Sequence, residues 1–285
     1  MLVVGCLMLT AHQADAGDAI LVIDSGVVRL CTSAAPPGEK LDPQSLVGSR
    51  VWAGARSGDR REVSLQAMAS DKSLVGVEGG DIGAILAYSQ PATFVALQEP
   101  SHDSTQISDL VLRRAQALGS DADHARITRI AYVDLDKAPG IETVVEASSW
   151  PPPGSVDKGH PLDFVGIFML SESGKPLGEL FNLRGREDQG AHYSREIIAI
   201  AKNPFDDGWD FLIEEKFVSG HADDADDDDA DDADDDDDAD ADDDDLGETE
   251  ASGPPAGPTL VRWVKVERYL DGEFASRNRM HWMQW

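Results

Sequence analysis

RITRIAYVDLDKAPGIETVVEA, residues 126–147, decides the fold of this chain. Residues 126–134 are rich in residues that favour strands, and they run into an acidic turn. Residues 141–147 form the exit strand, and the prolines at 151–153 end it, because consecutive prolines cannot continue a hydrogen-bonded ladder. The stretch predicts a β-hairpin whose turn carries carboxylates.

The same order of strand, polar turn and strand occurs again about seventy residues later. Residues 196–201 enter the turn at 203–208, and residues 209–217 leave it. Between the two units, residues 164–170 and 177–183 predict another hairpin. The chain therefore contains a weak internal repeat of hairpins.

The N-terminal third has the same character. Residues 19–23 and 27–31 are apolar runs around Asp24-Ser25-Gly26, which predicts a hairpin. Short β-favouring stretches follow near 47–53, 61–68, 74–78, 82–88 and 92–98. Strands this close together indicate an antiparallel meander and not βαβ units.

One segment predicts a helix. Ser104 is suited to cap it, Ile107, Leu110, Val111 and Leu118 lie along one face, and Gly119 follows its end. The apolar face is expected to lie on a sheet. The fold class is then mainly β (a β-rich α+β fold), with antiparallel hairpins, blade-like units and one docked amphipathic helix.

The charge of this protein is concentrated in one tract. The net charge is −30, but residues 221–250 hold 20 of the 54 acidic residues and no Lys or Arg. Like charges repel and the tract has no apolar pattern, so we expect a disordered insertion over 221–258. It divides a β-rich domain, 17–220, from a C-terminal hairpin, 259–285, that completes the same domain.

The N-terminus indicates export. Leu2 to Leu9 is a short apolar run, and Ala14-Asp15-Ala16 suits cleavage before Gly17, so residues 1–16 are interpreted as a truncated signal peptide. A lipid anchor at Cys6 is the rival interpretation. Either one predicts a periplasmic or extracellular protein, and the run is too short to span a bilayer.

The first acidic turn is the candidate metal site. Asp134, Asp136 and Glu142 stand at its first, third and ninth positions, and clustered carboxylate oxygens suit Ca²⁺. Here the sequence resembles the calcium loops of FG-GAP and VCBS-like repeats of integrin-type propellers. The resemblance implies β-hairpin blades, secretion, and calcium used for rigidity or adhesion.

The turn also has a metal-free interpretation, in which its carboxylates accept backbone N–H groups. Ala138 stands where the repeat has a further carboxylate, and fewer charged ligands mean weaker binding, so the metal-free interpretation is favoured. The second turn keeps Asp206, Asp207 and Asp210 but has other residues at its first positions.

Motifs for common enzyme classes are absent from the sequence: it has no Gly-x-Ser-x-Gly, no His-Glu-x-x-His and no phosphate-binding loop. It also has no cluster of Lys and Arg that would favour nucleic acid. We expect a non-catalytic envelope protein with a binding or structural role and a protein or glycan partner. The alternatives are an exported hydrolase of cell-wall or polysaccharide material, and an inhibitor or interaction module.

Overall fold

The computed structural model describes residues 18–33, 39–77, 83–101, 104–135, 140–149, 163–184, 192–218, 260–270 and 272–280. These residues form antiparallel strands, one α-helix and a short 3-10 helix, η1 (Pro43–Leu46). The predicted fold class, mainly β with one docked helix, is confirmed.

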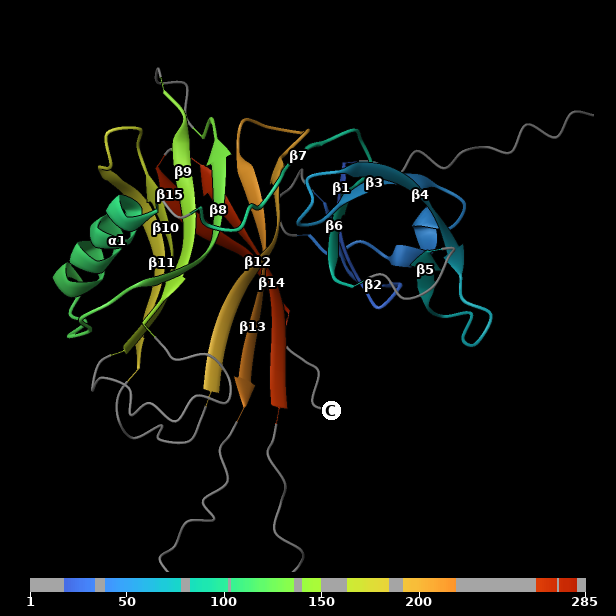
Figure 1. Cartoon of the computed structure of the whole chain (residues 1–285). Coiled ribbons are helices and arrows are strands. Elements are labelled where there is room, and N and C mark those ends of the chain that lie inside the picture. The colour runs from blue at the N-terminus through green and yellow to red at the C-terminus, as the bar shows by residue number, and fades with distance from the viewer. Residues whose placement is uncertain are drawn as a thin grey trace, which may run out of the picture.

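The elements lie in four layers (Figure 1). From left to right in that view they are the helix α1, a four-stranded sheet, a five-stranded sheet and a closed barrel. A separate group of buried apolar side chains fills each interface between layers and the interior of the barrel.

The barrel contains β1 (Ala19–Asp24), β2 (Val27–Ser33), β3 (Arg50–Gly54), β4 (Arg60–Ala67), β5 (Val75–Val77) and β6 (Ile85–Tyr88). The predicted hairpin is confirmed, since β1 and β2 pair around Ser25 and Gly26, whose φ angles of 51° and 76° suit a two-residue turn. The strand order β1-β2-β5-β4-β3-β6 is more complex than a meander, because β5 pairs with β2 and β6 pairs with β1 and β3.

The four-stranded sheet contains β8 (Arg126–Val133), β9 (Glu142–Ser148), β10 (Asp163–Leu170) and β11 (Pro176–Arg184). The five-stranded sheet contains β7 (Thr93–Val95), β12 (His192–Lys202), β13 (Trp209–Val218), β14 (Leu260–Leu270) and β15 (Glu273–Met280). The two predicted units of strand, acidic turn and strand are β8–β9 and β12–β13, and they lie in different sheets.

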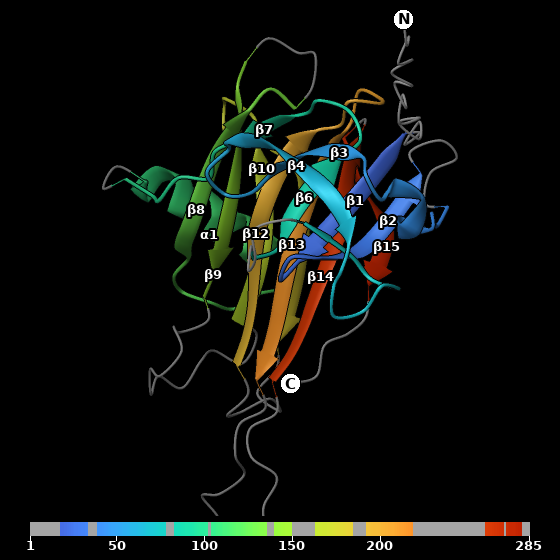
Figure 2. The ribbon, with the colours of Figure 1, turned by 90° about the vertical axis from the view of Figure 1, so that its right-hand side faces the viewer.

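The five-stranded sheet is covered on both faces. Phe211 and Ile213 of β13 pack toward the four-stranded sheet, and Leu212 packs toward the barrel; all three are 0% exposed. Figure 2 shows the barrel in front of this sheet, with the ends of β12, β13 and β14 extending past it. Because no water reaches the middle of the sheet, polar groups there need partners within the protein.

The helix α1 (Thr105–Ala117) lies on the outer face of the four-stranded sheet, as predicted (Figure 1). It begins directly after Ser104, but the Ser104 hydroxyl donates to the Ser101 carbonyl oxygen, 2.7 Å, and makes no capping bond. Its apolar stripe, which includes Leu110 and Val111, packs against Phe164 and Phe168. Side-chain burial therefore fixes the position of the helix.

The acidic tract joins two neighbouring strands. β13 and β14 pair from Trp209 opposite Tyr269 to Val218 opposite Leu260, so residues 219–259 connect paired strands. The predictions of a signal peptide over 1–16 and of disorder over 221–258 concern residues outside the described part. Within the described part, α1 has 13 residues, and no helix has the length and hydrophobicity to cross a membrane.

Removing Leu212 should destabilise the barrel and the sandwich, which is the pair of packed sheets, together. Leu212→Ala leaves a cavity between the two, so the free energy of unfolding should fall by about 2–5 kcal/mol. Urea unfolding followed by tryptophan fluorescence, with Trp52 in the barrel and Trp209 in the sheet, should show one transition. Leu270→Ala, at a 40% exposed leucine, is the control and should have little effect. A barrel that stays folded after the sheet unfolds would contradict this expectation.

Candidate functional site

The predicted metal site lies at the turn between β8 and β9. Glu142 is buried, and its Oε2 accepts a hydrogen bond from the backbone N–H of Leu135 at 2.7 Å. Asp134 is exposed, and Asp136 lies outside the described residues. Glu142 thus makes the backbone contact of the metal-free interpretation, while convergence of the three carboxylates on one point stays a prediction.

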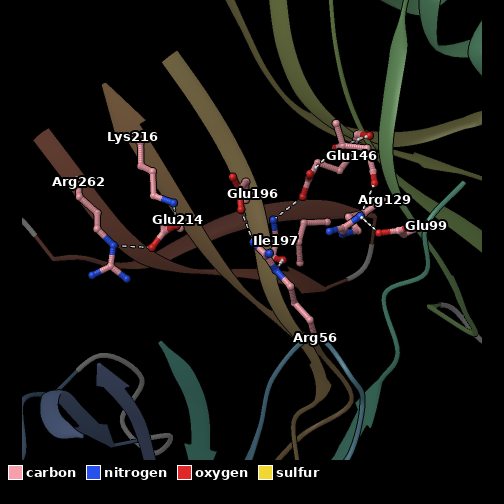
Figure 3. Close-up of polar contacts among 10 residues, drawn as sticks. Arg56, Glu99, Arg129, Glu146, Glu196, Ile197, Glu214, Lys216 and Arg262 are labelled. Carbon is pink, nitrogen blue, oxygen red and sulfur yellow. Dashed lines mark hydrogen bonds and ion pairs between the residues drawn. The ribbon is translucent and has the colours of Figure 1, made fainter. Parts of the chain in front are cut away.

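Among the described residues, no three His, Cys, Asp or Glu side chains are placed to hold a metal ion together. The polar side chains that do gather lie elsewhere, on β12 and on the segments that face it from both sides (Figure 3). This arrangement, the three-layer junction, consists of Arg56, Glu146, Glu196 and Ile197.

The junction is built on a β-bulge in β12. The pairing of β12 with β13 shifts between Ile197 and Ala199, which breaks the regular ladder. The N–H of Ile197 donates to Glu146 Oε2 at 2.6 Å, and its carbonyl oxygen accepts from Arg56 Nε at 3.1 Å (Figure 3). One residue of the five-stranded sheet, which is the central sheet of the molecule, therefore bonds to the four-stranded sheet through its N–H and to the barrel through its carbonyl oxygen.

Glu146 supplies the carboxylate. It lies on β9 and is 5% exposed, and its Oε1 accepts from the hydroxyl of Thr128 on β8. Burial raises the pKa of Glu146, and the charge of Glu196 adds to this, while the hydrogen bonds from Thr128 and Ile197 act in the opposite direction. Both oxygens of this buried carboxyl group are thus bonded inside the protein.

Arg56 supplies the cation from the loop between β3 and β4. Its guanidinium forms an ion pair with Glu196, and both side chains are about one third exposed. Burial alone would raise the pKa of Glu196, but the Arg56 hydrogen bond and the charges of Lys216, Arg56 and Arg129 hold that pKa below its usual range. Glu146 and Glu196 are therefore neighbouring carboxyl groups whose pKa values shift in opposite directions.

A second row of charges continues the junction along the barrel-facing side of the sheet. Arg262 of β14 bonds both oxygens of Asp24 on β1, at 2.7 and 3.2 Å, and its Nε donates to Glu214. Lys216 pairs with the same Glu214 (Figure 3). Asp24 and Glu214 are buried, so this row also ties the barrel to the central sheet.

The face of the central sheet that packs on the four-stranded sheet also carries buried ion pairs. The side chain of Arg195 is 4% exposed; its Nε donates to Glu215 at 2.8 Å and its Nη1 to the carbonyl oxygen of Leu180 on β11 at 3.0 Å. Lys265 pairs with Glu215 at 3.0 Å. Buried charges thus connect the layers on both faces of the central sheet.

Sequence reasoning did not find the three-layer junction. Its one sequence signal is Glu146 itself, because strand alternation puts it on the same inward face as Val144, where a carboxylate needs a partner. Along the chain, Arg56 lies 90 residues before Glu146, and Ile197 lies 51 residues after it. Local patterns do not reveal such distant pairing.

A pair of carboxyl groups with opposite pKa shifts is the arrangement that acid–base catalysis uses. Here the group with the raised pKa, Glu146, faces the backbone of β12 and not a solvent-exposed surface. The geometry suits a structural clamp better than a proton donor to substrate. No protein-family model matches the chain, and it has no significant match among curated proteins or solved structures.

The pKa of Glu146 should make stability depend on pH. Because burial raises the folded-state pKa above its ordinary value of 4.5, the folded protein holds this proton more tightly than the unfolded chain does. The contribution is fully present below pH 4.5 and is lost as pH rises through the folded-state pKa. Glu146→Gln does not titrate, so the unfolding free energy of the wild type minus that of the variant should fall by up to about 1.4 kcal/mol per pH unit between pH 4.5 and the folded-state pKa, and should stay constant above it.

Urea unfolding at a series of pH values checks this expectation. Glu39→Gln, at an exposed glutamate ahead of β3, is the control for removing a carboxylate that is not buried. A difference for Glu146→Gln that is flat, or that grows with pH, would show that burial does not dominate at this carboxyl group.

Proposed function

We propose that this chain is an exported, non-catalytic protein of the bacterial envelope that binds a partner, with calcium assisting at the first acidic turn. Its location is periplasmic or extracellular, and its partner is a protein or a glycan. The binding surface is the tip of the β8–β9 hairpin.

The observation that carries the binding role is a pair of exposed apolar side chains at that tip. Tyr132 is 52% exposed and Ile141 is 58% exposed. Tyr132 is paired with Thr143, so Ile141 is its diagonal neighbour, and strand alternation puts both on the outer face of the sheet. Exposed neighbouring apolar side chains on a hairpin are suited to contact another molecule.

The three-layer junction supports a non-catalytic role. The exported hydrolase alternative needs a carboxyl pair that faces substrate, with one member protonated near neutral pH. Glu146 has the raised pKa, but it is buried and both of its oxygens accept hydrogen bonds within the fold. The residue best suited to acid catalysis by its pKa is used to hold the layers together.

The resemblance of residues 134–142 to calcium loops of FG-GAP and VCBS-like repeats supports export and calcium. Asp134 is exposed beside Tyr132, so a cation bound there would stiffen the same tip that carries the apolar pair. The interaction-module alternative uses the same surface, and it differs from the main proposal in requiring no calcium.

Capture of envelope components tests the binding surface and the location together. Immobilised full-length protein should retain a component from a solubilised envelope fraction of the producing bacterium and not from its cytoplasmic fraction. Tyr132→Ser with Ile141→Ser should abolish retention because it removes the apolar contact, whereas Leu74→Ser, at a 38% exposed leucine of the barrel, should not. Equal retention by the tip variant, or retention from the cytoplasmic fraction alone, would argue against the proposal.

Calcium should raise the melting temperature through the first acidic turn. At a concentration about tenfold above a Kd of roughly 10⁻⁴ M, typical of extracellular calcium modules, stabilisation is about 1.4 kcal/mol, or about 3–5 °C. Asp134→Asn should remove this shift, and Asp59→Asn, at an exposed aspartate of the barrel, should keep it. An equal shift in Asp134→Asn would assign calcium to another part of the chain, and no shift in the wild type would remove calcium from the proposal.

A further inference from the structure

The turn between β12 and β13 is the second acidic turn, and it is closed by its own side chains. The Asn203 N–H donates to the Gly208 carbonyl oxygen at 3.0 Å, and Asn203 Oδ1 accepts from the Phe205 N–H at 2.8 Å. Asp206 Oδ1 accepts from the Gly208 N–H at 2.9 Å. These bonds fix the direction in which the aspartates of the turn present their carboxylates.

A buried guanidinium lies between two of these carboxylates. Arg268 stands on β14 opposite Asp210, and its side chain is 3% exposed. Its Nη2 contacts Asp206, and its Nη1 is 3.5 Å from Asp210 Oδ1. The guanidinium thus lies between a buried carboxylate, Asp210, and one that is 34% exposed, Asp206.

The backbone of the turn makes room for this guanidinium. A Cβ at Gly208 would lie 2.4 to 2.7 Å from the Nη2, Cζ and Nε atoms of Arg268, closer than van der Waals contact permits. Glycine at this position therefore allows the planar guanidinium to lie against the turn.

The pair of Asp210 and Arg268 is also bonded to the barrel. Asp210 is 0% exposed, and its Oδ2 accepts from the Tyr88 hydroxyl at 2.9 Å and from Asn203 Nδ2 at 2.7 Å. Tyr88 is the last residue of β6 and is also fully buried. Aspartate, arginine and tyrosine thus connect the central sheet with the barrel.

A buried carboxylate needs a compensating positive charge, and a removed partner leaves it strongly unfavourable. In an acidic turn a bound metal ion is one source of that charge. We propose that Arg268 takes the place of a metal ion in the second acidic turn. Its guanidinium supplies the positive charge that Asp206 and Asp210 need, and it thereby holds the turn and fixes the barrel on the sandwich. This inference does not depend on the proposed function, and it assigns any calcium response to a different part of the chain.

Two substitutions at Arg268 separate charge from packing. Arg268→Lys keeps a positive charge, and Arg268→Met keeps an unbranched side chain of similar length without it. The methionine variant should melt about 10 °C below the wild type, because a buried ion pair loses one partner, and the lysine variant should lose clearly less. Arg29→Met, at an exposed arginine of β2, is the control and should melt as the wild type does. A methionine variant as stable as the lysine variant would overturn the proposal.

A double-mutant cycle with Asp210 tests independently whether Arg268 and Asp210 act as a pair. If Arg268 compensates the charge of Asp210, Asp210→Asn should restore part of the melting temperature lost in Arg268→Met, because the unpaired carboxylate is gone. The double variant should then melt above the Arg268→Met single variant. Losses that simply add would show that the two side chains do not act as a pair, and would also overturn the proposal.

Discussion

The whole structure depends on satisfying the backbone of β12 at its bulge. Next to the bulge, Ile197 lies on a stretch of β12 that β7 does not reach, because β7 pairs only with residues 200–202. Ile197 is 0% exposed, so its peptide groups need partners other than water. The N–H of Ile197 takes a carboxylate from one neighbouring layer, and its carbonyl oxygen takes a guanidinium from the other. A local irregularity of one strand is thereby converted into contacts that hold three layers together.

The use of charged partners has an energetic consequence. Hydrogen bonds to charged groups are stronger than bonds between neutral groups, but each buried charge carries a desolvation cost. At Glu146 that cost appears as a raised pKa, and at Glu196 the nearby cations outweigh it. Removing one member of such a set is therefore more disruptive than its single contact suggests, because the remaining charge stays buried without compensation.

The local elements of this fold could be predicted from the sequence, because each is encoded within a few residues. Ser25 and Gly26 gave the first hairpin, and the apolar spacing around Leu110 and Val111 gave the helix. Closure of the barrel was not predictable in this way, since β2 meets β5 in a short pairing, Val27 with Gly76, that joins distant segments. The order of the layers could not be predicted for the same reason, because it depends on side chains from distant segments that meet across layers.

The same distinction between local features and distant contacts applies to the candidate site. Glu142 was identified because it stands in a turn, and it does act within that turn, on the N–H of Leu135. Glu146 was treated as one residue of a strand, although a carboxylate on the inward face beside Val144 is a signal of a buried polar contact. The second acidic turn shows what the turn pattern alone omits, because the cation that its aspartates meet comes from Arg268, on a strand 58 residues beyond Asp210.

The layered construction also limits where this protein can meet a partner. The inner face of the four-stranded sheet, both faces of the central sheet and the interior of the barrel are filled by side chains, and α1 covers much of the remaining face. Exposed surface suited to recognition is then concentrated at turns and strand ends. The β8–β9 tip, with Tyr132 and Ile141, is such a place, and it lies at the far end of the same strand that carries Glu146. Because the junction fixes β9 against the central sheet, it also fixes the position of that tip, so the rigid interior and the proposed binding surface are parts of one hairpin.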